Sequence, residues 1–160
     1  NSEILSLYYK FISEVLFKKF DNQILFQKKP GFRIQNLNNK AVSTWHSDGD
    51  DENKHPPGEI NIFLPLTRAF GNNSIWIETE PGKQDYHPIR LEYGEFLIFD
   101  GNNCKHGNYK NDTNITRVSF DFRILKREDY NPNYPIKTAT MGLSYVIGEY
   151  YLDRNSIVNL

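Results

Sequence analysis

Apolar residues recur every three or four positions along the beginning of the chain. Between Ser2 and Phe20 they stand at Ile4, Tyr8, Phe11, Ile12, Val15 and Leu16. This is the spacing of an amphipathic helix, which presents one apolar stripe to a neighbouring surface. We expect this helix to pack on the outside of the remaining structure.

After Asp21 the pattern changes to short runs rich in β-branched and aromatic residues, separated by Gly, Pro and Asn. Such runs are typical of strands joined by turns. The predicted strands are Gln23–Gln27, Phe32–Leu37, Ala41–Trp45, Glu59–Leu66, Ser74–Glu78, His87–Glu92, Glu95–Phe99 and Thr116–Ile124. About eight strands in roughly 100 residues favour a mainly β fold of two antiparallel sheets, a sandwich or jelly roll.

The length of the chain favours one domain over residues 1–160. Within it we expect residues 1–22 to form helical support and residues 23–124 the β core. Residues 125–160, rich in Tyr, Asn and Pro, are predicted to form an ordered C-terminal cover.

Charge and composition narrow the classes of partner. A net charge of −1 disfavours nucleic acid and anionic membranes as partners. No apolar run approaches the roughly 20 residues of a membrane span. The single cysteine, Cys104, excludes an intramolecular disulfide and favours a reducing, cytoplasmic setting. The short chain and compact predicted barrel favour a small-molecule substrate, and the oligomeric state is not predicted.

Two histidines and an aspartate form the strongest candidate site. His46 and Asp48 stand two apart near the end of a predicted strand, so both side chains point to the same side. His106 must be brought to them by the fold. Two imidazoles and one carboxylate hold non-haem Fe(II) on one face and leave positions open for a co-substrate and O₂. His46 alone would be read as a structural histidine, but the combination predicts a metal site.

Arg117 and Ser119 lie on one face of the last predicted core strand. A guanidinium matches a carboxylate with two parallel hydrogen bonds, and a nearby hydroxyl adds another. The pair therefore predicts an anionic ligand inside the barrel. The alternative is an ordinary salt bridge from Arg117 to Asp121 or Glu59.

Three further residues are candidates for ligand contacts. Asn61 interrupts an apolar strand and is expected either to face the co-substrate or to make a structural hydrogen bond. Trp76 and Glu78 share a strand face and are candidates for substrate contact, although an aromatic residue at such a position more often packs in a core.

An acidic loop at residues 48–57 leaves directly from the proposed ligand pair. It is placed to act as a lid, and its charge would attract a cationic substrate. A solvated surface loop is the alternative.

These motifs resemble those of the 2-oxoglutarate/Fe(II)-dependent oxygenases, most closely the phytanoyl-CoA hydroxylase-like and streptomycin-biosynthesis-like branch. The resemblance covers about half the chain, from Trp45 to Ile124. It rests on the runs EINIFLPLT, NSIWIE, GEFLIFD and RVSFDFR together with the histidine, aspartate and arginine motifs.

The resemblance implies a double-stranded β-helix, a cupin-like jelly roll, with Fe(II) held by His46, Asp48 and His106. It implies that 2-oxoglutarate chelates the iron while Arg117 and Ser119 bind its distal carboxylate. Reaction with O₂ would then convert 2-oxoglutarate to succinate and hydroxylate a small polar metabolite. In halogenating members a small residue replaces the carboxylate, so Asp48 favours hydroxylation, desaturation or ring closure.

Two other functions remain open. One is a cupin-like metalloenzyme that does not use 2-oxoglutarate, which would form no succinate. The other is a jelly-roll carbohydrate-binding module with Trp45 and Trp76 as stacking platforms. No motif identifies the prime substrate or the pathway.

Overall fold

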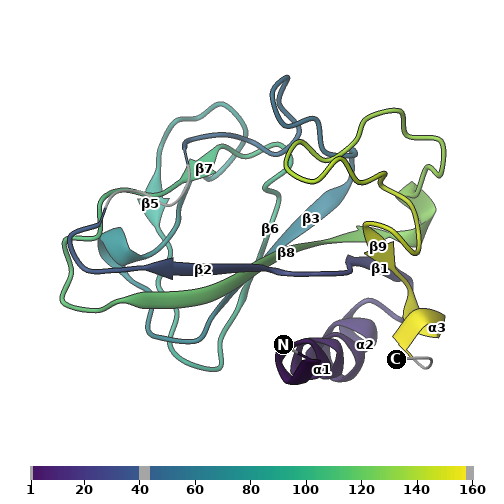
Figure 1. The fold of residues 1–160 in the computed structure, drawn as a ribbon. Coiled ribbons are helices and arrows are strands. Elements are labelled where there is room, and N and C mark those ends of the chain that lie inside the picture. The colour runs from purple at the N-terminus through teal and green to yellow at the C-terminus, as the bar shows by residue number, and fades with distance from the viewer. Residues whose placement is uncertain (1, 40–43, 158–160) are drawn as a thin grey trace.

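The N-terminal segment forms a helix that ends where the chain turns into the sheet. The structure is a computed structural model that describes residues 2–39 and 44–157 (Figure 1). α1 (Ser2–Phe11), a π-helical turn (Ile12–Leu16) and α2 (Phe17–Lys19) follow one another directly. Asp21 and Asn22 then adopt positive φ angles of 51° and 60°, which ends the helix. The predicted N-terminal helix is confirmed.

The strands form two antiparallel sheets, which confirms the predicted mainly β fold. In the larger sheet the order is β6-β3-β8-β1-β9, and β2 also pairs with β8. Its strands are β1 (Ile24–Gln27), β2 (Gly31–Gln35), β3 (Glu59–Pro65), β6 (Leu97–Phe99), β8 (Arg117–Lys126) and β9 (Tyr151–Leu152). The smaller sheet has the order β5-β4-β7. Its strands are β4 (Trp76–Ile77), β5 (His87–Pro88) and β7 (His106–Gly107).

The long strand β8 divides the molecule into a helix-covered side and a site-bearing side. Phe122 and Ile124 lie in one cluster with Phe26, Ile62 and the buried helix residues. In Figure 1 α1 and α2 lie below the large sheet, and the small sheet lies on its opposite side. Burial of these large apolar side chains fixes which face of β8 points away from the helix.

The other face of the large sheet is covered at one end by the C-terminal segment. Leu25 and Leu125 pack there against Tyr145, Tyr150 and Tyr151. Two short helices flank this region: η3 (Arg127–Asp129) after β8, and α3 (Arg154–Ile157) after β9. The remainder of this face, toward the start of β8, faces the small sheet, and the candidate site lies between the two.

Several strands are shorter than the sequence predicts. Only Trp76–Ile77 and His87–Pro88 form regular strands in the predicted runs 74–78 and 87–92. Beyond β5 the pairing continues as single contacts, such as the Ile89 N–H donating to the Ile75 carbonyl at 3.0 Å. Most of the predicted strand Ala41–Trp45 lies outside the described residues, and Thr44 and Trp45 are not in a strand.

Two strands were not predicted. β7 and β9 have two residues each, which is too short to show an alternating pattern. The short helix η2 (Gly71–Asn73) was not predicted either. No helix within the described parts of the chain is long and apolar enough to cross a membrane.

Candidate metal and co-substrate site

His46 and His106 face each other across a backbone contact between two chain segments. The N–H of His46 donates to the His106 carbonyl at 3.0 Å, and the N–H of His106 donates to the His46 carbonyl at 2.8 Å. Asp48 Oδ1 lies 3.3 Å from His46 Nε2 and 3.8 Å from His106 Nε2. One ligand atom from each residue thus lies within 4.8 Å of the others. The fold brings together the three residues chosen from the sequence as metal ligands.

Backbone carbonyls fix the orientation of both imidazoles. His46 Nδ1 lies 2.7 Å from the Thr44 carbonyl, and His106 Nδ1 lies 3.0 Å from the Cys104 carbonyl. Because a carbonyl oxygen only accepts hydrogen bonds, each Nδ1 carries the proton. Nε2 of each ring is then directed toward Asp48, and in the neutral ring it offers its lone pair to a metal ion. This donor set fits a divalent transition metal.

Asp48 is held by its second carboxylate oxygen. Asn61 Nδ2 donates to Oδ2 at 2.7 Å, and Arg123 Nε donates to the same oxygen at 2.8 Å. The carboxylate is 1% exposed. Oδ1 therefore remains on the side of the histidines, oriented to bind a metal ion through one oxygen.

The local charges set the protonation states in the metal-free site. Burial raises the pKa of Asp48, but the charge of Arg123 and the hydrogen bonds with His46 and Arg123 outweigh it and hold that pKa well below its usual range. The hydrogen bond to Asp48 raises the pKa of His46, with burial acting in the opposite direction. Burial lowers the pKa of His106, so this ring is neutral at physiological pH.

Arg117 is a buried cation that has no carboxylate partner among the described residues. Its side chain is 1% exposed, and Nη1 donates to the Asn73 carbonyl at 2.9 Å. Its Nε has no partner, and Phe63 lies 5.5 Å from the guanidinium carbon. Burial lowers its pKa to about 10. A buried guanidinium in this state favours an anionic ligand.

The salt bridges considered for Arg117 are not formed. Asp121 instead pairs with Arg33 at 2.9 Å and with Arg123 at 3.5 Å. Glu59 pairs with His55 at 2.7 Å and accepts a short hydrogen bond from the Tyr151 hydroxyl. The carboxylates of Asp121 and Glu59 thus pair with other residues. Arg117 keeps N–H donors that are available to a ligand.

Ser119 and Asn61 also carry unpartnered polar atoms. Ser119 Oγ and Asn61 Oδ1 are buried and have no hydrogen-bond partner in the described parts of the chain. Both residues line the same cavity as Arg117. Buried polar groups normally have partners, so each of these atoms is available to a ligand. Asn61 makes the structural hydrogen bond considered from the sequence and faces the cavity as well.

The structure places Trp76 and Glu78 away from this cavity. The carboxylate of Glu78 accepts hydrogen bonds from the backbone N–H groups of Lys105 at 2.6 Å and Gln84 at 3.0 Å. Trp76 packs edge-on against Tyr109, with ring centroids 5.0 Å apart. Neither residue lines the cavity that contains Arg117. In this structure Glu78 ties a loop to the segment before His106.

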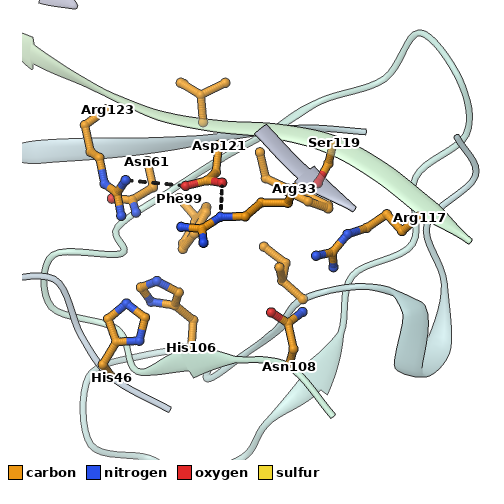
Figure 2. Close-up of a pocket in the computed structure, with 13 residues that line it drawn as sticks. Arg33, His46, Asn61, Phe99, His106, Asn108, Arg117, Ser119, Asp121 and Arg123 are labelled. Carbon is orange, nitrogen blue, oxygen red and sulfur yellow. Dashed lines mark hydrogen bonds and ion pairs between the residues drawn. The ribbon is translucent and has the colours of Figure 1, made fainter. Parts of the chain in front are cut away.

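The cavity lies between the histidines and the start of β8, and its volume is about 60 Å³ (Figure 2). Its lining residues are Arg33, His46, Asn61, Ile62, Phe63, Ile75, Phe99, His106, Asn108, Arg117, Ser119, Asp121 and Arg123. Figure 2 shows Arg33 reaching from β2 into the space between the histidines and Arg117. Sequence reasoning missed Arg33, because nothing in the sequence indicates that Arg33 would pair with Ser119 across the sheet.

Hydrogen bonds tie the loop at residues 48–57, considered from the sequence as a lid or a solvated surface loop, to other parts of the fold. Asp50 Oδ1 accepts hydrogen bonds from the backbone of Glu52 and Asn53. Tyr134 donates to the Lys54 carbonyl at 3.0 Å. Asn102 Nδ2 donates to the carbonyl of Pro56 at 2.9 Å. The loop is thus fastened at its middle and at its end to other parts of the fold.

Comparison with known proteins identifies the family. No family model matches the chain. Over 151 residues, which make up 94% of this chain and 71% of the relative, the chain is 41% identical to the streptomycin biosynthesis protein StrG of Streptomyces griseus. The chain therefore belongs to the StrG family.

Solved structures show the same fold at low sequence identity. The non-haem monooxygenase ThoJ in its nickel complex matches with a TM-score of 0.52 and 14% identity over 72% of this chain. Metal-free ThoJ matches with a TM-score of 0.52 and 13% identity over 72% of this chain. The chain spans about half the length of these structures, 49% and 51%. The likeness shows the shared jelly-roll fold.

Proposed function

We propose that this protein is an Fe(II)- and 2-oxoglutarate-dependent oxygenase that hydroxylates a small polar metabolite and converts 2-oxoglutarate to succinate. One observation carries the proposal. The metal-ligand atoms of His46, Asp48 and His106 lie together, and the two histidines line the same cavity as Arg117, which is buried and has no carboxylate partner among the described residues. A metal ion and a carboxylate-bearing co-substrate would satisfy both features.

The charges around the cavity support an anionic co-substrate. Arg33, Arg117 and Arg123 face two carboxylates, Asp48 and Asp121. This leaves one excess positive charge before a divalent metal ion adds two more. A dicarboxylate neutralises part of this charge, and the arrangement of Arg117 beside Ser119 suits one of its carboxylates.

Each residue has a separate task in this proposal. Bound Fe(II) and 2-oxoglutarate would supply the oxidising chemistry with O₂. His46 and His106 hold the metal through Nε2, and Asp48 holds it through Oδ1. Arg117 and Ser119 orient the co-substrate through its distal carboxylate. The presence of Asp48 favours transfer of oxygen over transfer of halide to the substrate.

The small-molecule substrate is supported by the relative. StrG is named as a streptomycin biosynthesis protein, which supports a metabolite over a macromolecule as the substrate. The carbohydrate-module alternative finds less support. The indole rings of Trp45 and Trp76 are half-buried and pack edge-on against Tyr86 and Tyr109, at centroid distances of 4.5 and 5.0 Å.

The direct test is turnover of 2-oxoglutarate. Purified protein with Fe(II), ascorbate and O₂ is expected to release succinate slowly without prime substrate, and His106→Ala is expected to release none. His87→Ala, an exposed histidine outside the cavity, is the matched control and should behave as wild type. Metal-dependent oxidation of a substrate without succinate would favour the cupin-like alternative.

A further inference from the structure

A second, larger cavity adjoins the candidate site. Its volume is about 510 Å³, and it shares Arg33, Asp121 and Arg123 with the smaller cavity. Its outer walls are the turn between β1 and β2 and the C-terminal segment, where Thr138, Thr140 and Leu143 line it. The three shared residues thus form the boundary between the two spaces.

Size separates the roles of the two cavities. The smaller one, about 60 Å³, lies between the histidines and Arg117 and is the space proposed for the metal and its co-substrate. The larger one is within the range of about 300–1,000 Å³ that is typical of sites for small organic molecules. A prime substrate can therefore lie in the larger cavity and still approach the metal at the shared boundary.

The larger cavity is lined by more cations than anions. Lys28, Lys29, Arg33 and Arg123 face Asp121 and Glu149. Arg123 is already neutralised, since it pairs with both Asp48 and Asp121. The acidic residues of the loop at residues 48–57 line neither cavity. The structure therefore gives no support to the cationic substrate that this loop suggested.

Arg33 and the two lysines have donors left for a ligand. Arg33 Nε donates to Asp121 at 2.9 Å, and its terminal nitrogens donate no hydrogen bond to the described residues. Lys28 Nζ donates to the Gly148 carbonyl at 2.9 Å, which leaves two of its three protons. Lys29 makes no ion pair with the described residues and is exposed at the mouth.

We propose that the larger cavity binds the prime substrate, and that this substrate carries an anionic group, a phosphate ester or a carboxylate, received by Arg33 with Lys28 and Lys29. The planar guanidinium would bind two oxygens of the anion, and the lysines would add charge on the solvent side. This inference rests on the proposed oxygenase function, because only an oxygenase would make the bound anion a substrate. Binding of the anion itself can be measured in the metal-free protein.

The test is calorimetric binding of small probes to metal-free protein. The probes are glucose 6-phosphate, gluconate and glucose. Each has six carbon atoms, and they differ in charge. The variants are Arg33→Gln, the double variant Lys28→Gln/Lys29→Gln, and Arg117→Gln. Arg90→Gln is the matched control, because Arg90 is exposed and lines neither cavity.

We expect at least one anionic probe to bind at least tenfold more tightly than glucose. Arg33→Gln should weaken that binding at least tenfold, and the double lysine variant should weaken it several-fold and flatten its salt dependence. Arg90→Gln should leave it within twofold, and Arg117→Gln should weaken it less than Arg33→Gln does. Whichever anion binds more tightly identifies the group.

Several results would overturn the inference. These are equal binding of all three probes, no binding of any, or binding that is lost in Arg117→Gln and kept in Arg33→Gln. Circular dichroism of each variant separates lost binding from lost fold. The oxygenase reaction is tested separately by succinate release. The two measurements therefore show which of the two proposals has failed.

Discussion

Arg123 holds Asp48 through a hydrogen bond from Nε to Oδ2 at 2.8 Å. The two residues are 75 positions apart in the chain. The bond turns the carboxylate so that Oδ1 faces His46, 3.3 Å away. Arg123 thus acts on the candidate metal site from behind one of its ligands, without facing the metal itself.

The first prediction concerns this support. Arg123→Gln should lower the affinity for Fe(II) or Co(II) by about 10- to 100-fold, the usual effect of losing a partner that orients a metal ligand. Metal titration followed by equilibrium dialysis measures it. Arg127→Gln is the control, since Arg127 pairs with Asp153 outside both cavities. An unchanged affinity in Arg123→Gln would show that Asp48 needs no such support.

The second prediction concerns Gly101. A Cβ at this position would lie 2.5 Å from the Asn61 amide, which donates to Asp48. Gly101→Ala should displace that amide and weaken metal binding about as much as Asn61→Ala does. Both changes remove the same hydrogen bond, from Asn61 to Asp48. The double variant should therefore bind metal no more weakly than either single variant. Fully additive losses would contradict a shared cause.

The third prediction separates the co-substrate from the metal. Arg117→Lys should weaken 2-oxoglutarate binding by about 2–5 kcal/mol, because an ammonium cannot make the paired hydrogen bonds of a guanidinium. Metal affinity should stay within twofold. Arg68→Lys, at a surface pair with Glu92, serves as the control. Equal 2-oxoglutarate affinities in wild type and Arg117→Lys would place the carboxylate elsewhere.

The fourth prediction concerns pH. His46 must lose its proton to bind metal, and its hydrogen bond to Asp48 raises its pKa above the ordinary 6.5. Metal affinity should therefore fall as the pH drops through this raised pKa, approaching about tenfold per pH unit below it. In the metal-free protein the protonated ring adds stability, which is complete below pH 6.5 and lost as the pH rises through the raised pKa.

Isothermal titrations with Co(II) between pH 8 and pH 6 provide the measurement. His87→Ala should retain the same pH dependence as wild type, because His87 lies outside the cavity. His106 is expected to lose its proton at a lower pH than His46, since burial lowers its pKa. A metal affinity that is constant across the range would contradict the raised pKa of His46.

The sequence predicts this fold well where a regular pattern of apolar residues continues over many positions. The helix and β8 are examples, since polar and apolar residues alternate in β8 from Arg117 to Ile124. That alternation also placed Arg117 and Ser119 together. Strands of two residues, such as β7 and β9, show no period and were missed.

The candidate site was predictable only in part. Residue type and local spacing pointed to His46 and Asp48, and to His106 as their partner. The hydrogen bonds that orient these three residues come from distant segments, as in the pairing of Arg123 with Asp48. The sequence also offered a salt bridge between Asp121 and Arg117 as an alternative. In the structure Asp121 pairs instead with Arg33 of β2. Strand register decides such pairings, and local sequence does not reveal it.

The central claim is that iron and 2-oxoglutarate bind together at the His46, Asp48 and His106 site. The most direct measurement is the visible spectrum of the protein under anaerobic conditions, as Fe(II) and then 2-oxoglutarate are added. We predict a weak charge-transfer band that needs both additions and is absent in His106→Ala. A spectrum without this band, in wild-type protein shown by elemental analysis to hold one equivalent of iron at saturating 2-oxoglutarate, would contradict the claim.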